Sequence, residues 1–97
     1  MDTLMWEAKA AEGRGAELLR WVLDEGVHAV AHPEVRTEVF VSGDRVVVIA
    51  VGEGAARRLP DPPEALIDRP PHAWPFTRVH APGETAAIVG ETDPRTA

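Results

Sequence analysis

The sequence predicts one α+β domain with a four-stranded antiparallel sheet and helices on one face of that sheet. Three observations predict it. A chain of 97 residues is long enough for one hydrophobic core and too short for two. Residues 35–41 and 45–51 are apolar or alternating stretches on either side of Ser42-Gly43-Asp44, which is the pattern of a β-hairpin. A helical pattern precedes this hairpin and a second helix start follows it, so the elements run β-α-β-β-α-β.

The first strand is expected at residues 4–8, ahead of a turn at residues 12–15. Successive side chains of a strand point to opposite faces of the sheet. One face is therefore expected to carry Leu4, Trp6 and Ala8, and the other Met5, Glu7 and Lys9.

A long helix is expected to begin near Ala16. Its apolar residues recur at helical spacing and form one face: Leu18, Leu19, Val22 and Leu23, with Trp21 beside them. Gly26 is expected to end or bend this helix, because glycine in a helix interior costs about 1 kcal/mol relative to alanine. A second helical piece is expected from Val27 to His32, where Pro33 stops it.

The two hairpin strands differ in what they are expected to bury. Residues 35–41 alternate, so this strand presents two different faces. Residues 45–51 are apolar on both faces, with Val46, Val48 and Ala50 on one and Val47, Ile49 and Val51 on the other. A strand of this kind is typical of the middle of a sheet that is covered on both sides.

The remaining elements are expected to be short. Residues 61–64, Asp-Pro-Pro-Glu, have the capping and proline pattern of a helix start. Pro70-Pro71 limits this second helix to a few residues. A fourth strand is expected from Trp74 to His80, and a last short strand at residues 85–89.

This order of elements is that of the ferredoxin-like fold. Its two helices cover one face of the sheet, and the chain then has no element left for the second apolar face of the third strand. A second subunit that packs sheet to sheet would cover that face, so the sequence predicts a homodimer. The domain is expected to span residues 1–90, with a flexible tail at residues 91–97.

Composition excludes several classes of function. The net charge is −6 and Lys9 is the only lysine, so we expect no nucleic-acid binding. The chain has no cysteine, which excludes disulfides and thiolate metal sites. It shows no signal peptide and no apolar run long enough to span a membrane, so we expect a cytoplasmic protein without membrane contact. Arginine in place of lysine, with abundant alanine, glycine, proline and valine, indicates a GC-rich bacterial source.

The long first helix, the hairpin and the terminal aromatic strand together resemble the dimeric α/β-barrel superfamily, over residues 3–90. Its small members include the antibiotic-biosynthesis monooxygenase-like proteins and related haem-degrading monooxygenases. The resemblance implies a ligand pocket between the sheet and the helices of each subunit, and in some members oxidation without a cofactor. It transfers no catalytic residue, because the characterised oxygenases use an asparagine and a tryptophan with a tyrosine or histidine. This chain contains neither asparagine nor tyrosine.

The candidate site lies in residues 69–80. Two histidines and two aromatic residues alternate there between prolines: His72, Trp74, Phe76 and His80. An apolar pocket that holds a group titrating near pH 7 suits proton abstraction. His72 and His80 are therefore the candidate catalytic residues, and Trp74 and Phe76 the candidate ligand-binding residues. The alternative is that both aromatic residues fill the core and both histidines sit at strand ends.

Trp6 and Trp21 are further candidates to line the same cavity, because the first strand and first helix are neighbours in this fold. Core packing is the favoured alternative for both. His28 and His32 are four residues apart, and Asp24 precedes His28 by four, which suits a divalent metal on an unbroken helix. A glycine and a proline interrupt this helix and no fourth ligand is evident. We therefore expect no metal site, and no other motif implies a cofactor.

Two functions remain open from the sequence. The first is a pocket for a small aromatic molecule, for example in a cofactor-independent monooxygenase-like protein. The alternative is a non-catalytic dimeric module that binds a ligand or a partner, or that stabilises an assembly. The sequence leaves undecided whether the protein is an enzyme.

Overall fold

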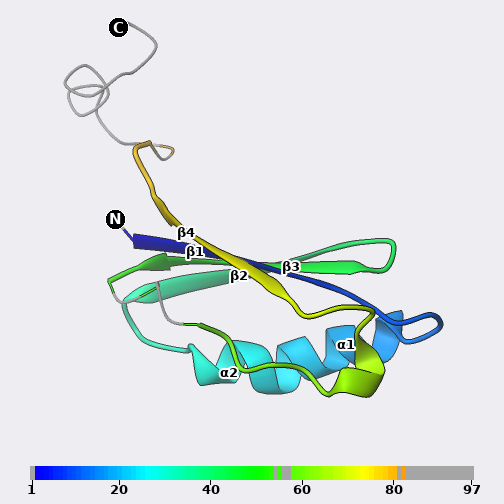
Figure 1. The fold of residues 1–97 in the computed structure, drawn as a ribbon. Helices are drawn as coiled ribbons and strands as arrows, with labels where there is room; N and C mark the ends of the chain where they lie inside the picture. Colours follow the sequence, from blue (N-terminus) through cyan, green and yellow to red (C-terminus); the bar gives the residue numbers. More distant parts are fainter. Residues whose placement is uncertain (1, 54, 56–57, 81, 83–97) are drawn as a thin grey trace, which may run out of the picture.

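The computed structural model describes residues 2–53, 55, 58–80 and 82 of the chain. In this part of the chain, four strands form one antiparallel sheet in the order β2-β3-β1-β4. The strands are β1 (Asp2–Lys9), β2 (Val35–Ser42), β3 (Arg45–Gly52) and β4 (His72–Thr77). A helical rod runs along one face of this sheet (Figure 1). The protein is thus α+β, as expected, and its sheet is consistent with a ferredoxin-like fold.

The helical rod consists of α1 (Gly15–Trp21), a π-helical turn η1 (Val22–Gly26) and α2 (Val27–Ala29), in direct succession. Gly26 therefore does not end the helix. A Cβ at this buried position would lie 3.3 Å from the Trp21 ring and 3.4 Å from Leu59, so glycine allows the close approach of these side chains. The helix ends before the expected His32, because Val30 already leaves the helical conformation at φ −109° and ψ 5°.

The second expected helix is reduced to one 3-10 turn, η2 (Glu64–Leu66). Prolines precede this turn at 60, 62 and 63 and follow it at 70 and 71, and each lacks the N–H that a longer helix would use. Backbone bonds to the end of β1 hold the segment: the Ala11 N–H donates to Leu66, and the Asp68 N–H to Lys9, both at 2.9 Å. The expectation of two covering helices was therefore wrong. One helical rod and the mostly extended residues 58–71 cover this face of the sheet.

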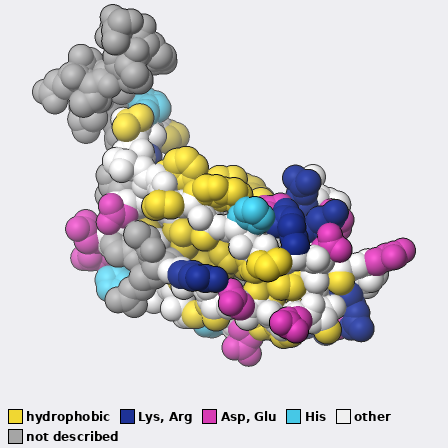
Figure 2. Space-filling model, in the orientation of Figure 1, with side chains coloured by type: hydrophobic (Ala, Val, Ile, Leu, Met, Phe, Trp, Pro, Cys, Tyr) yellow, Lys and Arg dark blue, Asp and Glu magenta, His cyan; other side chains and the backbone are white. Residues whose placement is uncertain are grey.

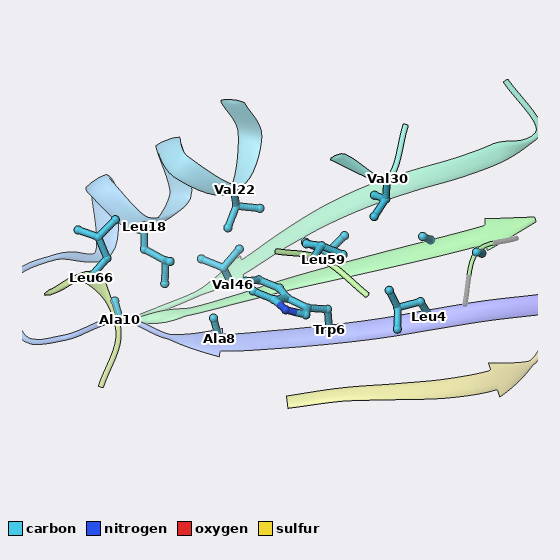
Figure 3. Packing of buried hydrophobic residues seen from close by; sticks show 13 residues of the cluster. Leu4, Trp6, Ala8, Ala10, Leu18, Val22, Val30, Val46, Leu59 and Leu66 are labelled. Carbon is cyan, nitrogen blue, oxygen red and sulfur yellow. The ribbon is translucent and has the colours of Figure 1, made fainter. Parts of the chain in front are cut away.

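The core lies between the sheet and these covering segments (Figure 3). β1 and β3 contribute alternate residues, as expected from the sequence: Leu4, Trp6 and Ala8, and Val46, Val48 and Ala50. The helical rod contributes Leu18 and Val22, and Val30 follows its end. The segment of residues 58–71, which we call the extended segment and which includes η2, contributes Leu59 and Leu66. Trp6 is the largest of the fully buried side chains and is 1% exposed. We call this side of the sheet the inner face.

Two backbone positions fix the shape of the hairpin. Gly43 has φ 59° in the tight turn between β2 and β3. Gly52 has φ 143° at the end of β3, and a Cβ there would lie 2.1 Å from the carbonyl oxygen of Glu34. Only glycine fits at this second position, because both its dihedral angle and its space exclude a side chain.

The two edges of the sheet are β2 and β4. β4 begins at His72 and ends at Thr77, three residues before the expected end at His80, and it contains Pro75 in register with Leu4. The expected strand at 85–89 and the tail at 91–97 lie outside the described residues. Among the described helices, none is long and apolar enough to cross a membrane.

Candidate functional site

The second side of the sheet, which we call the outer face, carries the alternate residues that point away from the helical rod. Residues that pair directly across antiparallel strands share a face. The register therefore arranges the outer face in three rows that cross β2, β3, β1 and β4 in turn. These rows are Arg36, Val51, Thr3 and Phe76; Glu38, Ile49, Met5 and Trp74; and Phe40, Val47, Glu7 and His72.

Seven apolar residues of these rows form one continuous patch, which we call the apolar patch: Met5, Phe40, Val47, Ile49, Val51, Trp74 and Phe76. Phe40, Trp74 and Phe76 are 49%, 40% and 53% exposed, and the other four are half-buried. Figure 2 shows hydrophobic side chains gathered in a band over the strands, with Lys and Arg side chains at one end. An exposed apolar patch of this kind marks an interaction site more often than a bare surface.

A charged cluster borders the apolar patch at the end of β1. The Glu7 carboxylate, whose side chain is only 11% exposed, accepts bonds from Nη2 of Arg69 at 2.9 and 3.0 Å. Nε of Arg45 lies 3.7 Å from the same carboxylate, which is an ion pair too long for a hydrogen bond. Two guanidinium groups thus share one carboxylate, and the cluster has a net charge of +1.

His72 and Trp74 form an aromatic pair beside this cluster. Their ring centroids are 5.4 Å apart and their planes make an angle of 23°, so the imidazole stacks on the indole. The pair borders an open hollow of about 370 Å³ on the outer face. Apolar, aromatic and charged residues line it together: Met5, Glu7, Arg45, Val47, Arg69, His72 and Trp74.

The structure brings together some of the site residues expected from the sequence. His72, Trp74 and Phe76 alternate along β4 and share the outer face, as their spacing indicates. His72 and Trp74 line the hollow, whereas Phe76 lies one row further along the apolar patch. His80 follows the end of β4 as an exposed residue outside the strand and does not line the hollow. Of the two candidate bases, only His72 is placed beside a candidate ligand site.

Trp6 and Trp21 do not join this site. Trp6 pairs with Ala73, the neighbour of Trp74, so the two tryptophans lie on opposite faces of the sheet. Trp21 packs half-buried against the core, with its ring beside Gly26. A hollow of about 360 Å³ does touch Trp6, but it opens on the inner face between β4 and the Arg58–Asp61 pair. Trp6 therefore lies in the core and Trp21 packs against it, which is the alternative to a place in the candidate cavity.

The histidines considered for metal binding lie near the end of the helical rod. His28 is exposed on α2, and Asp24 belongs to the π-helical turn. Nδ1 of His32 accepts a hydrogen bond of 3.1 Å from the backbone N–H of Glu34, in the corner that leads to β2. Within the described residues, no group of three His, Asp or Glu side chains is placed to hold a metal ion.

Five residues of the outer hollow were not among the candidate site residues: Met5, Glu7, Arg45, Val47 and Arg69. The available signal was Glu7, an acidic residue in the interior of a strand whose neighbours are apolar. A carboxylate that is nearly buried requires a cationic partner. That partner, Arg69, is 62 residues away in sequence, so no local spacing identifies it.

Comparisons with protein-family models, with curated proteins and with solved structures gave no significant match for this chain.

Proposed function

We propose that the protein is a homodimeric module of the ferredoxin-like class, in which the outer faces of two sheets pack together as in a dimeric α/β barrel. The apolar patch is the observation that carries this proposal. On a single chain it leaves Phe40, Trp74 and Phe76 in water, although burial of such a side chain stabilises by about 1.5–3 kcal/mol. A second copy offers the same patch, and a two-fold interface is self-complementary.

The area of the outer face supports a second copy as the occupant. Three strands have eight residues and β4 has six. With strands about 4.8 Å apart and about 3.3 Å per residue, the face covers about 400–500 Å² as a flat surface. Two such faces, with the relief of their side chains added, reach the total of about 1,000 Å² that a specific interface requires.

The distribution of charge agrees with this assignment. Arg36 and Glu38 lie on the edge strand β2 and pair with each other at 3.1 Å. Lys9 and Arg45 lie beyond the third row, at one end of the face. Charged residues of protein interfaces are depleted from the centre and belong to the polar rim. The apolar patch occupies the centre, and the charged residues surround it on two sides.

Sedimentation equilibrium at micromolar concentration tests the proposal. The expected mass is twice that of the 10.5 kDa chain. Ile49→Glu places a charge at the centre of the apolar patch, and we expect it to give a monomer with an unchanged circular dichroism spectrum. The matched control is Arg36→Glu at the rim, which should remain dimeric.

A wild-type chain that sediments as a monomer at all concentrations would contradict the proposal. Should Ile49→Glu unfold, the double variant Trp74→Ser/Phe76→Ser provides a second route, because both side chains are 40% or more exposed. A folded dimer of that double variant, with its dissociation constant unchanged, would also contradict it.

The stacked pair His72–Trp74 favours a second candidate function, a site for a small aromatic molecule in the outer hollow. In a catalytic form of this candidate, His72 is the base, because it lines the hollow and His80 does not. Oxygen uptake with a hydroquinone substrate would support catalysis if His72→Ala abolished it and left binding unchanged. Binding without turnover would support a ligand-binding module instead.

A further inference from the structure

We propose that the outer hollow binds a planar aromatic carboxylate. The proposal deepens the second candidate function and is argued without the proposed dimer, from residues of β1, β3 and β4 together with Arg69. The hollow combines a positively charged end, which would bind the carboxylate, with an aromatic and apolar wall, which would contact the ring.

The positively charged end supplies donors that Glu7 does not use. Arg45 is bound to Glu7 only by a contact of 3.7 Å, and its side chain is 59% exposed, so its guanidinium group is available to a ligand. Arg69 uses Nη2 for both oxygens of Glu7, while its Nη1 is buried and has no hydrogen-bond partner among the described residues. An unpartnered buried donor is unfavourable, so an acceptor that reached this end of the hollow would relieve that cost.

The guanidinium group is well suited to this anion. Its planar arrangement of N–H donors matches the two oxygens of a carboxylate. The single positive charge in excess over Glu7 matches a ligand with one negative charge. Glu7 itself opposes ligands with several charges, such as nucleoside polyphosphates, and the two arginines oppose cations and metal ions.

The apolar wall is suited to an aromatic ring. Trp74 and His72 are already stacked, and Trp74 is 40% exposed, so one more ring can extend the stack in the offset geometry that aromatic rings prefer. Met5 and Val47 are half-buried on the neighbouring strands β1 and β3 and form the floor. The volume of about 370 Å³ is within the range of small-molecule sites, about 300–1,000 Å³.

The hollow lies where the apolar patch passes into the charged cluster, in the rows of Trp74 and His72. Met5, Val47 and Trp74 line the hollow and also belong to the apolar patch, so the proposed dimer would cover this end of the hollow and leave its charged end at the polar rim. A ligand that enters at this rim contacts the arginines with its charged end and the apolar patch with its ring.

Isothermal titration calorimetry with 2-naphthoate, and with 2-naphthalenemethanol as its neutral counterpart, tests the proposal. We expect 2-naphthoate to bind about tenfold more tightly, since one charge-assisted hydrogen-bonded contact is worth about that factor. Arg45→Gln should reduce the preference for the anion, and Trp74→Leu should weaken both probes about equally. Arg36→Gln is the matched control, because this outer-face arginine lies outside the hollow.

Equal affinities for the two probes, or a preference unchanged in both Arg45→Gln and Arg69→Lys, would overturn the proposal. Arg69→Lys keeps a positive charge beside Glu7, so the variant should stay folded. It lacks the planar set of N–H donors that would bind the carboxylate. The same titration on monomeric Ile49→Glu separates this proposal from the dimer. A retained preference for 2-naphthoate supports a site within one subunit, and its loss in the folded monomer would overturn it.

Discussion

The two faces of one sheet have nearly the same supply of apolar residues and very different surroundings. In β3, Val46, Val48 and Ala50 are at most 2% exposed on the inner face. Their immediate neighbours on the outer face, Val47 and Ile49 among them, are half-buried. The helical rod and the extended segment cover the first set, whereas no described element covers the second. Burial is thus decided by what the chain can place over a face and not by the apolar content of the strand.

The two tryptophans of the sheet show the same difference at single-residue scale. Trp6 is 1% exposed in the core, and Trp74 is 40% exposed on the opposite face. Trp6 pairs with Ala73 in β4, and Trp74 is the next residue along that strand, so the two tryptophans point to opposite faces. A tryptophan is therefore a core residue in one case and a contact residue in the other.

The largest effect is expected from Trp6→Ala. Removal of a buried tryptophan leaves a cavity and loses its transfer free energy, so we expect the free energy of unfolding to fall by about 3–5 kcal/mol. Trp74→Ala is the matched change on the outer face, and in dilute solution it should cost less than half as much. Urea denaturation measures both. An equal loss in the two variants, independent of protein concentration, would show that the outer face is already covered within the chain.

A smaller effect is expected from Glu7→Gln, because Glu7 is the one buried polar residue in the part of the chain that the structure describes. Glutamine keeps the size of the side chain and removes the charge that two arginines share. The partners are partly exposed, with side-chain exposures of 33% for Arg69 and 59% for Arg45. We therefore expect a loss of about 1–2 kcal/mol in urea denaturation, below the cost of breaking a fully buried pair. A loss below about 0.5 kcal/mol would show that the ion pairs of Glu7 contribute no more to stability than exposed ion pairs do.

The smallest effect is expected from Arg36→Gln on the edge strand β2. Its contact with Glu38 joins side chains that are 79% and 48% exposed. Water and salt screen such a pair, so the free energy of unfolding should change by no more than about 0.5 kcal/mol. A change greater than about 1 kcal/mol, present at low and absent at high protein concentration, would show that Arg36 belongs to a contact between chains.

Much of the fold could be predicted from the sequence because its signals are local. The alternation in residues 4–8 predicts which residues share each face of β1, and the turn at Gly43 predicts the hairpin. The second helix could not be predicted correctly, because the capping pattern at residues 61–64 is also compatible with one 3-10 turn. The prolines on both sides of this turn, such as Pro70, outweigh the cap. Tertiary bonds to the end of β1 then hold the segment extended.

The candidate site could be predicted only in part. The alternation of His72 and Trp74 correctly indicates that they share a face of β4. It does not indicate which face, because this depends on the register of β4 against β1, and that register is a long-range property. For the same reason the sequence could not decide whether Trp6 lies in the core or beside Trp74. The Arg69–Glu7 pair was missed because strand pairing and a crossover connection, not sequence spacing, bring these residues together.

Pro75 in the edge strand β4 affects how strands of other chains can add to the sheet. A strand edge with unpaired N–H and C=O groups is a template for another chain, and proline on an edge removes one of its donors. Pro75 makes β4 such an interrupted edge, whereas β2 is an eight-residue edge without proline. Two copies that met edge to edge would pair β2 with β2 and leave a β4 at each end. Pro75 thus disfavours further strand pairing through β4, and with it fibre growth along the sheet.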